Sequence, residues 1–202
     1  IKILKTKNRY YRISWCNDTL AIGFDYWWNN RNTKTYLFNP SKPNDEPLII
    51  ADRNYQDRYS DPGSYINKRN KYGRSTLALK DGNLFLLGDG FTAEGQFPFL
   101  DKVNLSTMKK ERLYESRLID KKESLRDYML GEQEILVRIE SPSDYPNYYF
   151  RSLGDNSVDQ ITYFANPFIS LKNVYKELIK YKRHDGLDLS ATLYLPDGYD
   201  MN

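Results

Sequence analysis

The sequence predicts an all-β fold: a partial β-propeller of about three four-stranded antiparallel blades, followed by a β-hairpin. Most of the chain consists of short runs in which apolar and polar residues alternate, which is the period of a half-buried strand. A four-strand pattern recurs, and its second strands begin near Leu20, Leu84 and Ile135, which are 64 and 51 residues apart. Four strands in about 40–50 residues is the period of propeller blades. The polar segment 55–73 accounts for the longer first spacing.

The first repeat unit covers residues 12–51. We expect its strands at residues 12–16, 20–28, 33–38 and 47–51. Polar turn residues separate them, including Asn39 followed by Pro40. Trp27 and Trp28 are adjacent in the second strand, so we expect them to face opposite sides, one in the core and the other at a cleft or an interface.

Two further units repeat this pattern. In the second unit, we expect strands at residues 75–79, 84–87, 98–105 and 111–114. In the third unit, we expect strands at residues 125–130, 134–139, 148–153 and 159–163. The charged segment 108–124 between them fits a loop or a short helix equally well. Pro167 breaks the last strand, and residues 168–176 fit a linker with a helical turn.

The C-terminal segment is predicted to form a hairpin. Two β-prone stretches, residues 177–181 and 189–195, flank the turn His184-Asp185-Gly186. Glycine accepts the positive φ that tight hairpin turns need. Three blades alone leave two open edge faces, whereas a closed propeller protects its edges. We therefore expect either further blades on the N-terminal side or self-association through the open edges.

Composition excludes several classes of function. The 202 residues include 30 basic and 27 acidic residues, a net charge of +3, so there is no basic surplus to indicate nucleic-acid binding. Cys16 is the only cysteine, which excludes an internal disulfide and a multi-cysteine zinc site. No run of 18 apolar residues indicates a membrane span. The chain begins at Ile1, so we expect a processed or cut piece, and the compartment stays open.

No residue in the chain is predicted to be catalytic. The nucleophile motif G-x-S-x-G is absent, and Gly63 and Ser64 lie in an Asp-Pro-Gly-Ser segment that predicts a turn. His184, the single histidine, is interpreted as a turn residue of the hairpin because no nucleophile motif accompanies it. Cys16 lies on an apolar strand and is interpreted as a small buried filler.

Loops supply the remaining candidates. The glycine-rich segment 88–95 follows a strand but precedes Pro98 and another strand, so it predicts a tight loop and not a nucleotide site. The acidic residues around it lack the spacing of an EF-hand, and we predict no metal site and no cofactor. Segment 53–61 alternates charges with tyrosines, which fits a solvated loop or a pore or cleft loop. Lys68 and Arg69 form a basic doublet just after it, a candidate contact for an acidic substrate group.

Three stretches together resemble the propeller domain of the prolyl oligopeptidase superfamily, particularly its glutamyl endopeptidase-like branch. Two are more specific to that branch: residues 51–64, ADRNYQDRYSDPGS, and residues 87–101, LGDGFTAEGQFPFLD. The third, residues 181–200, contains R-x-D-G-x-x-L-x-A-x-L-Y-L-P-x-G-Y-D, which is widespread in the superfamily. The resemblance runs from about Trp15 to Asp200.

The resemblance implies a serine peptidase whose propeller lies over the active site and screens substrates by size, and whose branch cleaves after glutamate. Residues 1–167 would be propeller blades. Residues 168–202 would be a linker and the first hairpin of an α/β-hydrolase domain that carries the Ser, Asp and His triad. This chain contains none of the triad, so it would be inactive alone. Lys68 and Arg69 fall where relatives also tend to be basic.

Two other interpretations remain open. One is a free-standing propeller that binds or scaffolds without catalysis. The other is a propeller enzyme with its own site, such as a glycosidase, which needs two carboxylates about 5–10 Å apart in one cleft. The scattered acidic residues nominate no such pair. The expected partners are a peptide substrate, the chain's own hydrolase domain, and a second copy at open blade edges.

Overall fold

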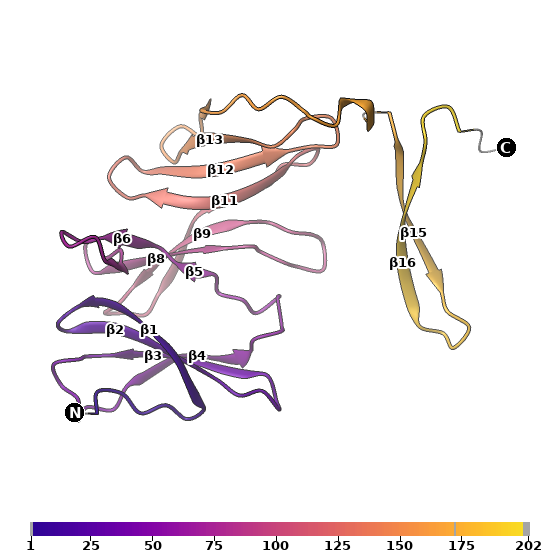
Figure 1. Cartoon of the computed structure of the whole chain (residues 1–202). Helices are drawn as coiled ribbons and strands as arrows, with labels where there is room; N and C mark the ends of the chain where they lie inside the picture. Colours follow the sequence, from indigo (N-terminus) through magenta and orange to yellow (C-terminus); the bar gives the residue numbers. More distant parts are fainter. Residues whose placement is uncertain (1, 172, 200–202) are drawn as a thin grey trace.

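The computed structural model describes residues 2–171 and 173–199. Its strands form three four-stranded antiparallel sheets, which we call blades 1, 2 and 3, and two smaller two-stranded sheets. The blades are stacked face to face, and a separate hairpin lies to one side of the stack (Figure 1). This arrangement confirms the predicted partial propeller followed by a hairpin.

Blades 1 and 3 are simple meanders in which each strand pairs with the next along the chain. Blade 1 consists of β1 (Arg9–Asn17), β2 (Leu20–Tyr26), β3 (Asn32–Phe38) and β4 (Leu48–Asn54). Blade 3 consists of β11 (Lys122–Met129), β12 (Glu134–Glu140), β13 (Asn147–Ser152) and β14 (Val158–Gln160). These strands follow the predicted order.

Blade 2 differs from the prediction in its first strand. It consists of β5 (Ser64–Tyr65), β8 (Asn83–Gly88), β9 (Phe99–Asn104) and β10 (Lys110–Glu115). The segment expected as its first strand is instead β7 (Ser75–Leu77), which pairs with β6 (Asn67–Arg69) in a small sheet of its own. The polar segment 55–73 therefore supplies a blade strand and half of an inserted hairpin.

The structure confirms the strand expected at residues 111–114 and corrects the loop or short helix expected over the rest of segment 108–124. This segment holds β10 and the start of β11, and it contains no helix in the described part of the chain. Leu113 and Tyr114 are half-buried in β10, whose charged residues are exposed or half-buried at the blade edge. The residues 116–121 between the two strands connect blade 2 to blade 3.

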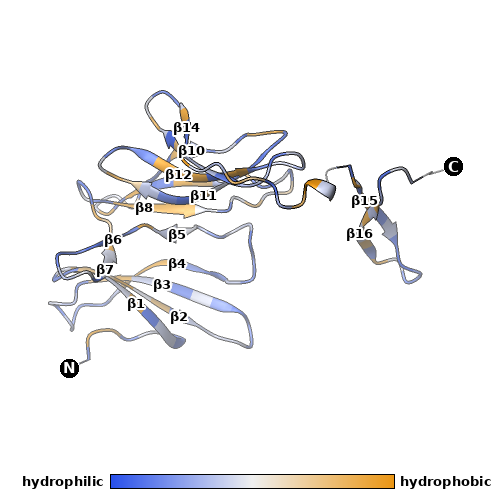
Figure 2. Cartoon of the chain, turned by 45° about the horizontal axis from the view of Figure 1, so that its top comes forward, coloured by the Kyte–Doolittle hydropathy of each residue, from blue (hydrophilic) through white to orange (hydrophobic). Residues whose placement is uncertain are grey.

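The hydrophobic core lies between the sheets. Ile22 of blade 1 packs with Leu77 and Leu84, and blades 2 and 3 meet through a larger cluster. The buried members of that cluster are Ile66, Ala78, Phe85, Leu100, Tyr128, Ile135 and Val137. The apolar colouring of β8 in Figure 2 reflects its position between two neighbouring blades. Burial at both sheet faces explains why the second strands were the clearest repeat signal in the sequence.

A buried carboxylate ties the N-terminal segment to blade 1. Asp25 is 1% exposed and accepts hydrogen bonds from the backbone N–H groups of Asn8 and Lys34, each at 2.8 Å, and from the Tyr36 hydroxyl at 2.6 Å. The Asn8 side-chain amide donates to it as well, at 3.1 Å. Burial, and then the bond to Asp25, raises the pKa of Tyr36 to about 12.

The two adjacent tryptophans do not lie as expected. The strand β2 ends at Tyr26, and Trp27 closes a turn by bridging to Asn32. Trp27 is 46% exposed and Trp28 is 65% exposed, with the Arg31 guanidinium 3.8 Å above the Trp28 ring. Neither ring is in the core, because the polar turn after Tyr26 takes both out of the pleated strand.

The C-terminal hairpin consists of β15 (Tyr175–Lys182) and β16 (Asp188–Leu195), preceded by a 3-10 turn (Ile169–Leu171). Gly186 has φ of 87° and donates to the carbonyl of Arg183 at 2.8 Å, as the Asp-Gly signal predicted. All eight residues of β15 are exposed. The hairpin lies near one end of the blades, which we call the hairpin-facing end (Figures 1 and 2).

Candidate functional site

The two most distinctive sequence stretches, residues 51–64 and 87–101, meet in blade 2. Ser64 of β5 pairs with Leu87 of β8. Gly63 adopts φ of 90°, and a side chain there would place its Cβ 2.4 Å from the Leu87 carbonyl oxygen. Gly90 adopts φ of 63°, with the Phe97 carbonyl oxygen 1.8 Å from the position of a Cβ. Glycine is required at both positions, because backbone lies against backbone.

Beside this contact lies a hollow of about 320 Å³, which we call the cup. Its wall combines the loop 58–62, the loop 90–99 and one edge of β10. The main side chains around it are Arg58, Phe91, Phe97, Phe99, Lys110, Arg112 and Glu115. The cup therefore has aromatic walls and a rim that carries three cations.

Each of the three phenylalanine rings of this region has an arginine guanidinium over its face. The guanidinium of Arg58 lies 4.0 Å from the ring centre of Phe91. Arg112 lies 4.1 Å from that of Phe99, and Arg117 lies 4.0 Å from that of Phe97. Cations over aromatic faces are attracted by the ring quadrupole, and the contact also orients the planar guanidinium.

Carboxylates neutralise most of these cations. Asp101 is fully buried and lies 2.5 Å from Arg112 and 3.5 Å from Lys110. Glu115 pairs with Arg112 and also with Arg117, the latter at 2.5 Å. Arg58 is the exception, because its contact with Asp89 is 4.0 Å long and both side chains are exposed.

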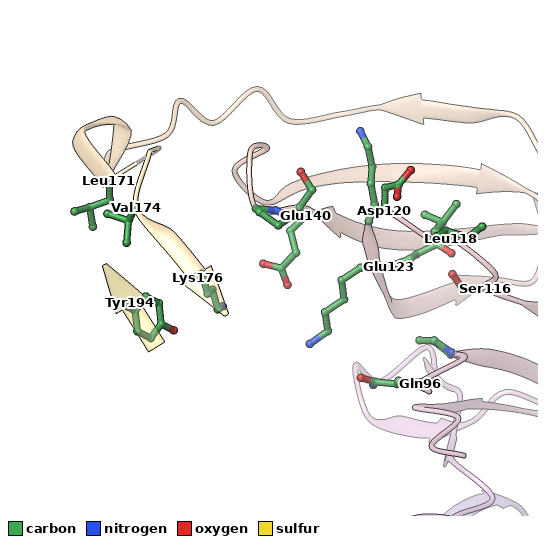
Figure 3. A pocket seen from close by; sticks show the side chains of 16 residues that line it. Gln96, Ser116, Leu118, Asp120, Glu123, Glu140, Leu171, Val174, Lys176 and Tyr194 are labelled. Carbon is green, nitrogen blue, oxygen red and sulfur yellow. The ribbon is translucent and has the colours of Figure 1, made fainter. Parts of the chain in front are cut away.

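A second, larger cleft of about 940 Å³ lies between blades 2 and 3 and the hairpin. Gln96 and Pro98 line it from the same loop that forms the cup, and Lys176 and Tyr194 line it from the hairpin. Figure 3 shows Tyr194 and Lys176 on one side, with Glu140 and Glu123 on the other. The cup and this cleft thus share the hairpin-facing end of blade 2.

The wall of the cleft contains a buried ion pair. Glu123 is 2% exposed and accepts hydrogen bonds from Nε and Nη2 of Arg151, at 2.9 and 2.7 Å. The Tyr114 hydroxyl of blade 2 donates to the same carboxylate at 2.5 Å, so the group joins blades 2 and 3. Burial, followed by this hydrogen bond, raises the pKa of Tyr114.

Lys68 and Arg69 lie on β6, exposed, at the end of the blade stack opposite the hairpin (Figure 1). Arg69 donates to the carbonyl of Gly73 at 3.2 Å. Neither residue lines the cup or the larger cleft. A role in contacting acidic substrates remains a prediction for this doublet.

The other sequence candidates take structural positions. His184 is exposed in the hairpin turn. Cys16 is partly buried, its sulfur lies 3.7 Å from the Leu77 carbonyl, and burial raises the pKa of its thiol. Segment 88–95 forms a tight loop closed by the Phe91–Gln96 bridge. The residues that the structure describes contain no cluster of three or more metal-ligating side chains and no helix fit to cross a membrane.

Sequence reasoning singled out the loop 53–61 but missed the cup. Arg58 was visible as one charge among several in that loop. Lys110 lies in the segment expected to be a loop or short helix, and Arg112 lies in the strand expected at residues 111–114 within it. A signal was present in the sequence: three phenylalanines lie within residues 91–99, and the cations Lys110 and Arg112 follow two residues apart, as on one side of a strand. Only the pairing of β9 with β10 brings them together.

The chain is similar to known proteins over nearly its whole length. The chain is 39% identical over 209 residues to the protein named "Probable glutamyl endopeptidase, chloroplastic" of Arabidopsis thaliana. It is 37% identical over 206 residues to the protein of the same name from Oryza sativa subsp. japonica. Both alignments cover 95% of this chain and 22% of the relative, so the chain spans about a fifth of their length.

Among solved structures, the chain is similar to oligopeptidase B from Leishmania major, with a TM-score of 0.50 and 9% sequence identity. That alignment covers 95% of this chain and 32% of the other, and it supports the fold alone. No family model matches the chain. The first of these alignments covers 95% of this chain, so it spans the blades and reaches into the hairpin. The chain therefore belongs to the prolyl oligopeptidase superfamily of serine peptidases, in its glutamyl endopeptidase-like branch, as a portion that carries propeller blades.

Proposed function

We propose that this chain is the substrate-gating propeller portion of a serine peptidase that, at full length, cleaves peptides after acidic residues. The observation that carries the proposal is the 39% identity over nearly the whole chain to a relative named as a glutamyl endopeptidase. Residues 1–167 would be propeller blades, and residues 168–202 would be a linker and the first hairpin of the catalytic α/β-hydrolase domain.

The hairpin supports this division. An isolated two-stranded hairpin is marginally stable in water, and the whole of β15 is exposed here. The exposed apolar side chains of Leu178 and Ile179 need a covering partner. In the proposed protein, that partner is the hydrolase domain, which would place the nucleophile near the hairpin-facing end of the blades.

The blades would restrict access to the nucleophile. Their cores lie between neighbouring sheets, so the stack is a packed wall that would keep folded proteins away from the nucleophile. Lys68 and Arg69, at the far end of the stack, would meet acidic substrates as they arrive. The outer faces of blades 1 and 3 would be covered by further blades or by a second copy.

The test is a peptidase assay of the full-length protein with matched peptides that contain Glu or Gln at one position. We expect cleavage after Glu to exceed cleavage after Gln by at least about tenfold in kcat/KM, equal to roughly 1.4 kcal/mol. A folded domain with the same Glu on its surface should resist cleavage until it is denatured. Lack of hydrolysis of both peptides, together with lack of a G-x-S-x-G motif after residue 202, would refute the peptidase and favour a binding module.

A further inference from the structure

We infer that the cup is a binding site for an acidic side chain of the peptide substrate, and that Arg58 determines the preference for a carboxylate. This inference rests on the proposed peptidase function and adds the group that recognises the substrate. The cup lies at the hairpin-facing end, on the loop whose Gln96 and Pro98 also line the larger cleft.

Among the cations of the cup, Arg58 has the weakest pairing with carboxylates of the protein. Lys110 and Arg112 share the buried carboxylate of Asp101, and Arg112 also pairs with Glu115. Asp61, which lines the cup as well, pairs with Arg53 at 3.2 Å. Within the described residues, Asp89 is the one carboxylate within 4.0 Å of Arg58, and it lies at that limit. Arg58 is therefore the rim cation with the most capacity left for a ligand.

The guanidinium of Arg58 is held in place before any ligand arrives. It lies 4.0 Å from the ring centre of Phe91. The loop that carries Phe91 is closed by the hydrogen bond from Phe97 N–H to the Gly90 carbonyl at 2.8 Å. Its own loop is pinned as well, since Arg53 donates to the Asp57 carbonyl at 3.1 Å and the Asp57 carboxylate accepts from Tyr59 N–H at 3.0 Å. Fixing both loops lowers the entropy lost on binding.

The chemistry of the cup fits a carboxylate on a short aliphatic stem. A guanidinium stacked on a ring keeps its N–H groups in one plane, and such a fork binds a carboxylate through two parallel hydrogen bonds. The side chains of Phe97 and Phe99 offer apolar surface for the methylene groups. A hollow of about 320 Å³ lies at the low end of ligand-binding pockets and suits one side chain.

The inference is tested in the full-length protein by measuring kcat/KM for matched Glu and Gln peptides. We expect R58A to lower kcat/KM for the Glu peptide by roughly 10- to 100-fold, as for loss of a hydrogen bond to a charged group, with little change for the Gln peptide. R58K keeps the positive charge but not the planar guanidinium, so its kcat/KM for the Glu peptide should lie between those of the wild-type protein and R58A. F91L keeps Arg58 but removes the ring that orients it, so it should also weaken the Glu preference.

The matched control is R74A, which removes an exposed arginine outside the cup and should leave both peptides unaffected. Because Arg58 is exposed, R58A should unfold at the wild-type temperature. If R58A lowers kcat/KM equally for both peptides, or leaves the preference for the Glu peptide intact, the inference is wrong while the proposed function stands. If the wild-type protein shows no preference for Glu, the proposed function fails and the inference fails with it.

Discussion

The buried pair of Glu123 and Arg151 gives the sharpest stability prediction. Replacing Glu123 with alanine removes the acceptor of two hydrogen bonds from Arg151 and one from Tyr114. Arg151 is 7% exposed, so its guanidinium would remain inside the protein without a carboxylate. Breaking a buried pair in this way costs about 3–5 kcal/mol, because an uncompensated charge stays buried.

The contacts that Arg151 keeps in E123A place the expected loss of stability at the low end of this 3–5 kcal/mol range. Its Nη1 still donates to the Asn156 carbonyl at 3.3 Å, and its guanidinium lies 5.2 Å from the ring centre of Tyr114. The adjoining cleft of about 940 Å³ can admit water to the site of the missing carboxylate. We therefore expect E123A to lower the free energy of unfolding by about 3 kcal/mol, the low end of the range.

The double variant E123M/R151M separates charge from packing. Replacing both ions by apolar side chains of similar size is often neutral, so the double variant should recover most of the stability lost by E123A. The measurement is chemical denaturation followed by circular dichroism, with hydrogen exchange to locate the loss in β11 and β13. A cost below about 1 kcal/mol for E123A, or a double variant less stable than E123A, would show that an uncompensated buried charge on Arg151 is not the source of the loss.

Three other perturbations follow from the structure. D25A should lower the free energy of unfolding by about 3 kcal/mol, because it leaves the buried Tyr36 hydroxyl and two backbone N–H groups without their acceptor. Intrinsic tryptophan fluorescence measures this loss, since all three tryptophans lie in blade 1. G90A should disrupt the loop at a cost of about 2 kcal/mol, whereas G131A, with open space around its Cβ, should be neutral or stabilising in thermal unfolding. Burial raises the pKa of Tyr36 and of Tyr65 to about 12, from an ordinary 10.0, so the folded state holds both protons longer than the unfolded state. Their stabilising contribution is complete below pH 10 and should be lost between pH 10 and 12, and urea titrations across that range should show a shallower decline for Y36F and Y65F.

The blade order was predictable because buried strands leave a strong signal. Runs such as residues 84–87 and 134–139 are apolar at the core positions, and each became the second strand of its blade. The hairpin turn at Gly186 was predictable from two residues alone, since few sequences accept its backbone angles.

The first strand of blade 2 was not predictable in the same way. Strand β5 has two residues, too few to show any period, and it follows a turn in a polar segment. Ser75–Leu77 has better strand propensity, but it pairs with β6 and leaves the blade position to β5. Tertiary pairing decided between two candidates that local pattern could not rank.

The cup was hidden for a different reason. Its cations come from segments more than 50 residues apart, and their charges are individually ordinary. What makes Arg58 distinctive is the ring of Phe91 beneath it and the distance of its counter-ion, and both depend on how two loops pack. Sequence pattern can locate such loops, but the chemistry arises only where they meet.

The contact between Gly63 and Leu87 couples the lengths of two loops. Because backbone touches backbone there, no side chain can shrink or rotate to absorb a change. One added residue in either loop would move its far part by roughly 3.3 Å, enough to carry Arg58 off the Phe91 ring. Substitutions in these loops can adjust the cup, but an insertion or deletion in one loop must be matched in the other or the cup is lost.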